Sequence, residues 1–348
     1  MNENNEKITP KVAIVSLNPS LDKLLVLGEP LVPGRMVRAK YSHTSPGSKG
    51  YNAAAMLEKL GTAVEYLSFT DGRTDDVHVK EAEANFSKTY FRKVACPMRE
   101  NIKTMDPFGQ LTEINLPGGP VFDNEEDDLI DRLFETEARV VGLLGSIPQG
   151  VEKSVYNYLI PRLHKKKKIC VVDCDGEAMK YALMAKPDII KPNHTELYEI
   201  CRNLEIKEFK DVDLEIVNNP WKNCVKPGGN PPDGALELAK RCGKIADVTS
   251  ARVLCTVGKD GAMCARPGDD TVLYCPAPKV EKAWGQSGAG DCFLGAYIHA
   301  FFERSYLNEW WHEREALLFA VAAGSTKCLF NRGVIPRSED VMSVLGRK

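Results

Sequence analysis

Short apolar runs, each followed by a stretch with helical periodicity, recur along the chain and constrain its fold more than any other feature. A run of this kind is typical of a strand buried on both faces of a parallel sheet. The clearest examples are Val12–Leu17, Glu65–Phe69, Arg139–Leu144, Ile169–Val172 and Val253–Val257. Because helices separate successive strands, the pattern predicts an α/β fold with a doubly wound, mostly parallel sheet flanked by helices.

Two stretches, at about 22–45 and 89–116, are instead rich in strands and poor in helices. The strands that we predict there are Leu24–Leu31, Met36–Tyr41, Thr89–Val94, Asn101–Met105 and Leu111–Leu116. We therefore expect one domain over residues 1–348, with a small accessory β-sheet inserted in it. A segment rich in Asn, Pro and Gly, Asn218–Gly234, predicts a surface loop.

The composition excludes several classes of partner. With a formal net charge of −2, the chain gives no reason to expect nucleic acid or an acidic membrane surface as a partner. No apolar run approaches the roughly 18 residues that a membrane helix needs. The 11 cysteines form no Cys-x-x-Cys pair and no signal peptide is evident, so we expect a reduced, cytoplasmic setting.

The segment from Gly285 to Tyr297 carries the strongest chemical signal. Gly288, Ala289 and Gly290 precede Asp291, and an apolar, helix-like run follows. Small residues let an anion approach the backbone closely, and a helix start offers unpaired N–H groups to it. Asp291 is then placed to act as a general base beside a transferring phosphoryl group. Taken alone, the segment is equally compatible with an ordinary capping turn.

Polar residues at other turns form a second set of candidates. Asp22 follows the first strand, at the sheet edge where ligands collect in open α/β folds, although a turn cap is the plain alternative. Pro46–Gly61 is a Gly-rich turn that leads into a helix with Asn52 near its start. Basic residues recur through the accessory strands, where they line either a binding face or an ordinary solvated surface.

These motifs together resemble the ribokinase/PfkB family of carbohydrate kinases, over nearly the whole chain. The two family signatures are PGSKGYNAAAMLEKLG and SGAGDCFLGAY, and NPSLD, LGSIPQG, KPNHTE, TVGKDG and AVAAGS occur in the expected order. NPSLDK, MRENIK and TEINLPGG are similar to the branch that phosphorylates sugar phosphates, which includes 1-phosphofructokinase, tagatose-6-phosphate kinase and the minor 6-phosphofructokinase. The resemblance implies a ribokinase-like fold whose accessory strands form a lid over the sugar and the contact of a homodimer.

The resemblance also implies roles for particular residues. Asp291 would be the catalytic base, and Gly288, Ala289 and Gly290 the anion hole. Contacts to the sugar phosphate would come from Asp22, Arg35, Arg38, Gly47, Ser48, Lys49, Asn52, Arg99, Lys103 and Ser146. Contacts to ATP would come from Asn193, Glu196, Thr256, Gly258, Gly261, Ser287 and Asn331. Glu196 would also help to position Mg²⁺, through water.

The chain departs from the family pattern at two places, and three functions are compatible with the sequence. Ser48 stands where the family usually has glycine, and Gln286-Ser287 replaces a Thr-containing pair before the glycine turn. The sequence favours a kinase of a fructose- or tagatose-type monophosphate. The alternatives are a kinase of an unphosphorylated sugar or nucleoside, which would leave the basic residues unpaired, and a weakly active binding or regulatory protein. Which sugar phosphate is used, and whether it is allosterically regulated, stay open.

Overall fold

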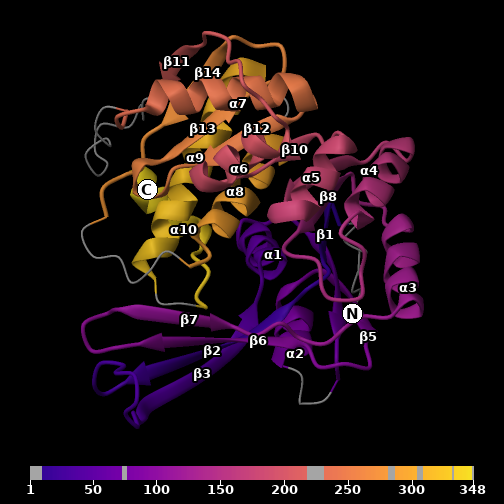
Figure 1. Ribbon diagram of the computed structural model, residues 1–348, viewed down its shortest axis with the longest axis vertical. Helices are drawn as coiled ribbons and strands as arrows, with labels where there is room; N and C mark the ends of the chain where they lie inside the picture. Colours follow the sequence, from indigo (N-terminus) through magenta and orange to yellow (C-terminus); the bar gives the residue numbers. More distant parts are fainter. Residues whose placement is uncertain are drawn as a thin grey trace, which may run out of the picture.

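The chain forms a large sheet covered by helices on both faces and a smaller, separate sheet beside it (Figure 1). The computed structural model describes residues 10–72, 77–217, 231–280, 287–303, 309–330 and 333–346. The predicted 218–234 loop and the Gln286 position therefore lie largely or wholly outside the described residues. Among the described residues, no helix combines the length and apolar character that crossing a membrane requires.

The large sheet has ten strands and is mostly parallel. Its spatial order is β11 (Asp213–Ile216), β14 (Thr271–Cys275), β13 (Ala262–Ala265), β12 (Arg252–Thr256), β10 (Ile189–Ile190), β9 (Ile169–Asp173), β8 (Val140–Leu144), β1 (Val12–Ser16), β4 (Val64–Thr70) and β5 (Lys88–Lys93). Only β13 runs antiparallel to its neighbours. The predicted doubly wound, mostly parallel sheet is confirmed.

Alternate residues of each buried strand enter different cores, as the period of a strand requires. In β1, Ala13 and Val15 pack with α3 (Asp123–Phe134), α4 (Val155–Lys165), α5 (Gly176–Met184), α6 (His194–Asn203) and α7 (Ala235–Thr249). Val12 and Ile14 face the opposite core, which is formed with α1 (Lys49–Lys59), α2 (Val77–Asn85), α8 (Ala289–Glu303), α9 (Glu309–Leu329) and α10 (Ser338–Leu345). Burial on both faces explains why these strands are continuous apolar runs.

The small sheet, which we call the lid sheet, has four strands in the order β3 (Ala39–Gly47), β2 (Ser20–Leu27), β6 (Arg99–Met105) and β7 (Leu111–Asn115). It extends away from the body at the lower left of Figure 1. One expectation was wrong: the strand predicted at Thr89–Val94 is β5, which pairs in parallel with β4 in the large sheet. Residues 36–38 also lie before β3 rather than in a strand.

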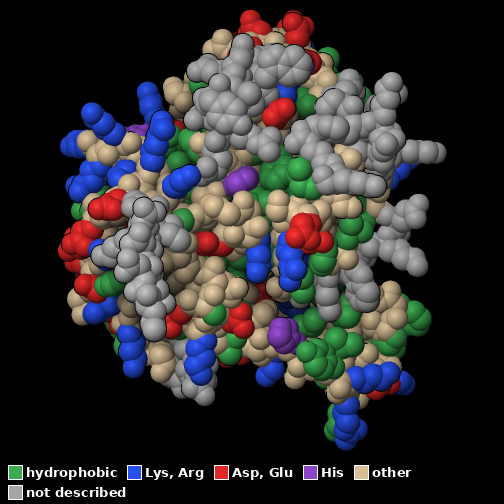
Figure 2. Space-filling view, turned by 180° about the vertical axis from the view of Figure 1, so that it is seen from behind, with side chains coloured by type: hydrophobic (Ala, Val, Ile, Leu, Met, Phe, Trp, Pro, Cys, Tyr) green, Lys and Arg blue, Asp and Glu red, His purple; other side chains and the backbone are tan. Residues whose placement is uncertain are grey.

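The outer surface carries charges of both signs. On the face shown in Figure 2, acidic and basic side chains are interspersed, although Lys and Arg gather along one edge. Lys165, Lys166 and Lys167, at the end of α4, are exposed and form a basic run in the sequence. This distribution agrees with the near-neutral net charge of the chain.

Candidate active site

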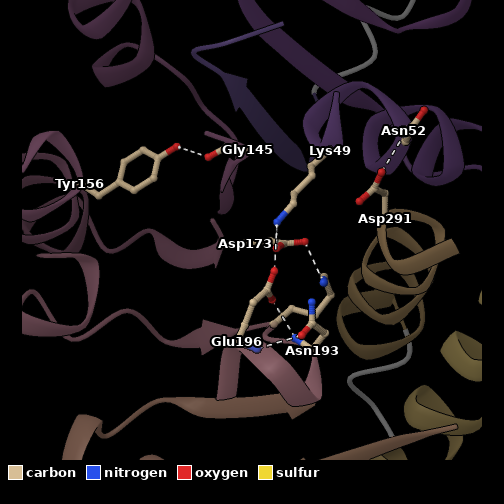
Figure 3. A network of polar contacts seen from close by, with 9 residues as sticks. Lys49, Asn52, Gly145, Tyr156, Asp173, Asn193, Glu196 and Asp291 are labelled. Carbon is tan, nitrogen blue, oxygen red and sulfur yellow. Dashed lines mark hydrogen bonds and ion pairs between the residues drawn. The ribbon is translucent and has the colours of Figure 1, made fainter. Parts of the chain in front are cut away.

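The predicted base and its glycine turn lie at the start of α8. Gly288 has a φ of 79°, which glycine adopts without strain, and its carbonyl accepts the first helical hydrogen bond from the Cys292 N–H at 2.9 Å. The turn therefore directs the backbone N–H groups of the first helical residues outward, where an anion can bind. Asp291 lies in the first turn, and its Oδ2 accepts a hydrogen bond from Asn52 Nδ2 at 2.8 Å (Figure 3).

The electrostatic surroundings of Asp291 favour a base near neutral pH. Burial raises the pKa of its carboxyl group from 3.8 to about 6, and the nearby charge of Asp173 adds to that rise. The hydrogen bond from Asn52 and the charges of Lys191 and Lys49 partly offset it. A carboxylate with a pKa close to the working pH is well matched to proton abstraction from a hydroxyl group.

A buried network of two acids and two lysines lies next to Asp291. Asp173, at the end of β9, is 1% exposed; it pairs with Lys49 Nζ at 2.9 Å and with Lys191 Nζ at 3.0 Å. Burial opposes ionisation of Asp173, but the two lysines hold its pKa below the usual value. Burial likewise disfavours the charged form of Lys49, yet Asp173 and Glu196 raise its pKa above the ordinary value.

The Asn193/Glu196 pair forms the N-terminal cap of α6. The Asn193 side chain accepts from the Glu196 N–H at 2.9 Å, and Glu196 Oε2 accepts from the Asn193 N–H at 2.8 Å. The other oxygen, Oε1, is directed toward Lys49 Nζ at 3.9 Å (Figure 3). The reciprocal cap thus fixes the orientation of Glu196 and leaves one carboxylate oxygen on the side of the acid–lysine network.

The Gly-rich turn before α1 ends in a serine that caps the helix. Ser48 has a φ of 114°, a conformation that favours glycine; its Oγ lies 3.0 Å from Ser16 Oγ and accepts from the Tyr51 N–H at 3.1 Å. Ser48 and Lys49 were predicted to contact the sugar. Among the described residues, Ser48 caps the helix and Lys49 faces Asp173 and Glu196, and their contact with the sugar phosphate stays a prediction.

Three of the predicted sugar-binding residues, Asp22, Gly47 and Lys103, lie close together on the lid sheet. Asp22 Oδ1 accepts from Ser20 Oγ at 3.1 Å and from Asn101 Nδ2 at 2.8 Å, and Oδ2 accepts from Lys103 Nζ at 2.5 Å. A Cβ at Gly47 would lie 2.3 Å from Asp22 Oδ1, so only glycine leaves room for this carboxylate. Asp22 is thereby held rigidly at the start of the lid.

Four of the basic residues predicted to contact the sugar phosphate lie on the lid or its connections and differ in burial: Arg35, Arg38, Arg99 and Lys103. Arg99 is half-buried; burial lowers the pKa of its guanidinium, against the opposing charges of Asp22 and Asp175. Its buried Nε has no hydrogen-bond partner within the described part of the chain. Arg35 and Arg38 lie in the β2–β3 connection and are exposed. Arg99 is therefore the best placed of the four to meet a substrate anion.

Ser146 follows β8, as predicted, at the carboxyl edge of the sheet. Its Oγ accepts a hydrogen bond from Asn18 Nδ2 at 3.0 Å, and Asn18 in turn follows β1. Because β1 and β8 are parallel neighbours, both residues emerge at the same edge. The sequence reasoning had not singled out Asn18.

A cavity of about 940 Å³ opens beside the start of α8. Its lining includes six residues predicted for the anion hole or for ATP: Asn193, Thr256, Gly258, Gly261, Ala289 and Gly290. Apolar walls come from Phe293, Val321 and Pro276, and the volume is sufficient for a nucleotide. Ser287 contacts Lys103 instead, and Asn331 lies outside the described residues.

Besides Asn18, three residues at the site were missed by sequence reasoning: Asp173, Lys191 and Asn101. Asp173 ends a buried strand, which is a signal that could have been used, since polar residues at that position face the ligand edge. Lys191 lies within the KPNHTE motif, and Asn101 within MRENIK. Their roles depend on contacts between distant strands, which a local pattern does not encode.

Comparison with known proteins identifies related chains over nearly the whole length. A model of the pfkB family of carbohydrate kinases matches residues 17–335. The 1-phosphofructokinase of Borreliella burgdorferi is 25% identical over 332 residues, which is 95% of each chain. That of Bacillus subtilis is 27% identical over 254 residues, or 72% of this chain and 82% of that protein.

Solved structures share the same architecture. Phosphofructokinase-2 from Escherichia coli, in complex with substrates and products, has a TM-score of 0.79 at 24% identity and covers 97% of this chain and 98% of that chain. A ribokinase from Thermotoga maritima has a TM-score of 0.69 at 20% identity, with 97% and 99% covered. At these identities the similarity establishes the fold, which is ribokinase-like, as predicted.

Proposed function

The chain belongs to the pfkB family of carbohydrate kinases, and from that premise we propose that it transfers the γ-phosphoryl group of ATP to a hydroxyl group of a ketose monophosphate. The substrate class is of the fructose-1-phosphate, fructose-6-phosphate or tagatose-6-phosphate type. The observation that carries the proposal is the position of Asp291, which lies beside the nucleotide-sized cavity and bonds to Asn52 near the lid residues. Both reactants can thus meet at one carboxylate.

In this proposal each part of the site has one task. The cavity beside α8 holds the nucleotide, and the N–H groups of Gly288, Ala289 and Gly290 hold the phosphoryl group in line with the acceptor. Asp22 accepts hydrogen bonds from sugar hydroxyls, and Asp291 takes the proton of the attacking hydroxyl as the new P–O bond forms. The raised pKa of Asp291 lets it accept that proton near neutral pH.

Magnesium fits the donors that the site offers. Oxygen ligands with retained waters are what Mg²⁺ prefers, and Glu196 keeps Oε1 available on the side of the acid–lysine network. We propose that Glu196, oriented by Asn193, binds a water of the hydrated ion. The ion, when bound, would neutralise phosphate charge during the transfer.

The phosphorylated substrate is supported by Arg99. A half-buried guanidinium whose Nε has no partner among the described residues is costly unless an anion compensates it. A substrate phosphate would supply that anion and can be bound by arginine through two hydrogen bonds. A neutral sugar would leave the desolvation of Arg99 uncompensated.

The test is Arg99→Ala with the preferred sugar phosphate. Loss of a charged hydrogen bond should weaken substrate binding by roughly 1.5–3 kcal/mol, read as an increase in KM for the sugar phosphate with KM for ATP unchanged. Arg38→Ala, an exposed arginine on the same lid, is the matched control and should change this KM little. An unchanged KM in Arg99→Ala would remove Arg99 from the phosphate site.

We also propose a homodimer formed through the lid and a cytoplasmic location. Large apolar side chains are exposed on the lid and its connections, including Met36 (77%), Tyr41 (58%) and Phe108 (84%), and a contact between two lids would bury them. A solved form of Escherichia coli phosphofructokinase-2 is described as tetrameric, so larger assemblies occur among similar folds. Sedimentation of the wild type and of Phe108→Ser tests the dimer; a monomeric wild type would exclude it.

A further inference from the structure

Lys103 joins the lid sheet to the turn that precedes α8. It lies on β6, and its Nζ contacts Asp22 Oδ2 at 2.5 Å and Ser287 Oγ at 3.2 Å. Ser287 immediately precedes Gly288, the first residue of the glycine turn. The Lys103 side chain is only 11% exposed, so its ammonium group is held between the sugar-binding carboxylate and the phosphoryl-binding turn.

Lys103 and Arg99 are at opposite ends of the same lid face. Both share a face of β6 with Asn101, which lies midway between them, and Arg99 pairs with Ser20 whereas Lys103 pairs with Leu24. Four residues of a strand span about 13 Å, so the two backbones are well separated. The acids whose charges act on Arg99 are Asp22 and Asp175, and Asp175 follows β9 in the sheet. Lys103 is at the other end, beside the α8 turn.

We infer that Lys103 is a catalytic residue that contacts the transferring phosphoryl group, and that Arg99 alone of the two binds the phosphate already present on the substrate. This inference rests on the proposed function. It gives different roles to two cations that were both predicted to contact the sugar phosphate. The separation follows from the contact of Lys103 with the turn before the anion hole and from the distance along β6 to Arg99.

A cation at this position would assist the transfer. The acceptor hydroxyl loses its proton to Asp291 as its oxygen bonds to the γ-phosphorus, the bond from phosphorus to the bridging oxygen breaks, and ADP leaves with that electron pair. Negative charge is spread over the three equatorial oxygens of the phosphoryl group during this step. A lysine ammonium group beside the glycine turn stabilises that charge and keeps its own proton throughout.

A simpler role for Lys103 would be to neutralise Asp22. The ion pair at 2.5 Å would serve that purpose, and removing the lysine would then harm catalysis only by disturbing Asp22. The contact with Ser287 has no part in such a role, because Ser287 is neutral and belongs to the other side of the site. Contact with the phosphoryl group and neutralisation of Asp22 are distinguished by combining substitutions of Lys103 and Asp22.

The experiment compares Lys103→Met with Arg99→Ala, which serves as the control from the same strand and face. Steady-state kinetics are measured with the preferred ketose monophosphate and with the same ketose without its phosphate. Lys103→Met should lower kcat by about 10²–10³-fold with both substrates, as loss of one transition-state donor does. Arg99→Ala should instead raise KM for the phosphorylated ketose and leave kcat/KM for the unphosphorylated ketose nearly unchanged.

A second comparison uses Asp22→Asn alone and together with Lys103→Met. If Lys103 contacts the phosphoryl group, the double variant has a kcat about 10²-fold below that of Asp22→Asn. Equal kcat values would show that Lys103 acts only through Asp22 and would overturn the inference. Binding of a fluorescent ADP analogue and denaturant unfolding of each variant establish that the fold and nucleotide site are retained.

The outcomes separate this inference from the proposed function. If the wild type turns over only an unphosphorylated sugar, the proposed substrate class fails, and the kcat of Lys103→Met on that sugar still decides the role of Lys103. If the wild type uses a ketose monophosphate and Lys103→Met raises only its KM, with kcat unchanged, Lys103 binds the substrate phosphate and the inference is wrong.

Discussion

Replacing Asp291 by asparagine should make the protein less active and more stable at neutral pH. The unfolded carboxyl group ionises near 3.8 and the folded one near 6. Between these values unfolding releases a proton, so the free energy of unfolding of the wild type falls as pH rises from about 4 to about 6 and stays low above that range. Because an asparagine does not ionise, the free energy of unfolding of the variant does not show this decrease with pH.

The size of the effect follows from the two pKa values. The difference between 3.8 and about 6 corresponds to about 3 kcal/mol at pH 8. This is an upper value, because Asp291 keeps partial exposure. Near pH 4 the folded carboxyl group is protonated, and the variant and the wild type should be nearly equally stable. The Asn52 amide can still donate to the side-chain carbonyl of an asparagine at this position, so packing is retained.

Denaturant unfolding at pH 4 and pH 8, with kcat measured in parallel, tests this reasoning. Asp291→Asn should lower kcat by about 10²–10⁴-fold and raise the free energy of unfolding at pH 8 only. Asp173→Asn is the matched control and should lower the free energy of unfolding at pH 8. Two lysines lower the pKa of Asp173, and removing its charge leaves both lysines uncompensated. If Asp291→Asn changed the free energy of unfolding equally at both pH values, the claim that burial raises the pKa of Asp291 would be refuted.

Three further predictions concern the pH profile and two backbone positions. The kcat/KM of the wild type, corrected for the ionisation of the substrate phosphate, should decline below about pH 6 as Asp291 is protonated; a plateau down to pH 4.5 would contradict the base assignment. Ser48→Ala should cost about 1 kcal/mol in denaturant unfolding by loss of the cap, and Ser48→Gly less, since glycine relieves the φ of 114°; equal costs would exclude backbone strain. Gly261→Ala should raise KM for ATP more than KM for the sugar, because a Cβ there would lie 2.1 Å from the Cys275 carbonyl oxygen; unchanged kinetics would show that the turn adapts.

The features that could be predicted from the sequence are those that a local pattern encodes. The strands of the large sheet are continuous apolar runs because both of their faces are buried, as β1 illustrates. The turn before α8 needs small residues because Gly288 takes a positive φ, and the following acid falls in the first helical turn. Such features determine which type of residue stands at each position, so they are visible in the sequence itself.

The features that were missed depend on partners distant in the sequence. The segment Lys88–Lys93 is half-polar, as the lid strands are, and only its pairing with β4 places it at the edge of the large sheet. The family resemblance assigned Lys49 to the sugar phosphate, and no local pattern shows that its Nζ also pairs with Asp173, on another strand. Similarly, alternation along β6 places Arg99 and Lys103 on one face. It does not reveal that Ser287, which is distant in the sequence, contacts Lys103.

The central claim, that this chain phosphorylates a sugar that already carries a phosphate, is tested most directly by ADP release with MgATP and a panel of acceptors. The panel contains fructose-1-phosphate, fructose-6-phosphate, tagatose-6-phosphate, fructose, ribose and adenosine. We expect efficient turnover with one phosphorylated ketose, at a kcat/KM far above that for fructose. Turnover with ribose or adenosine alone, or with none of the six, would contradict the claim.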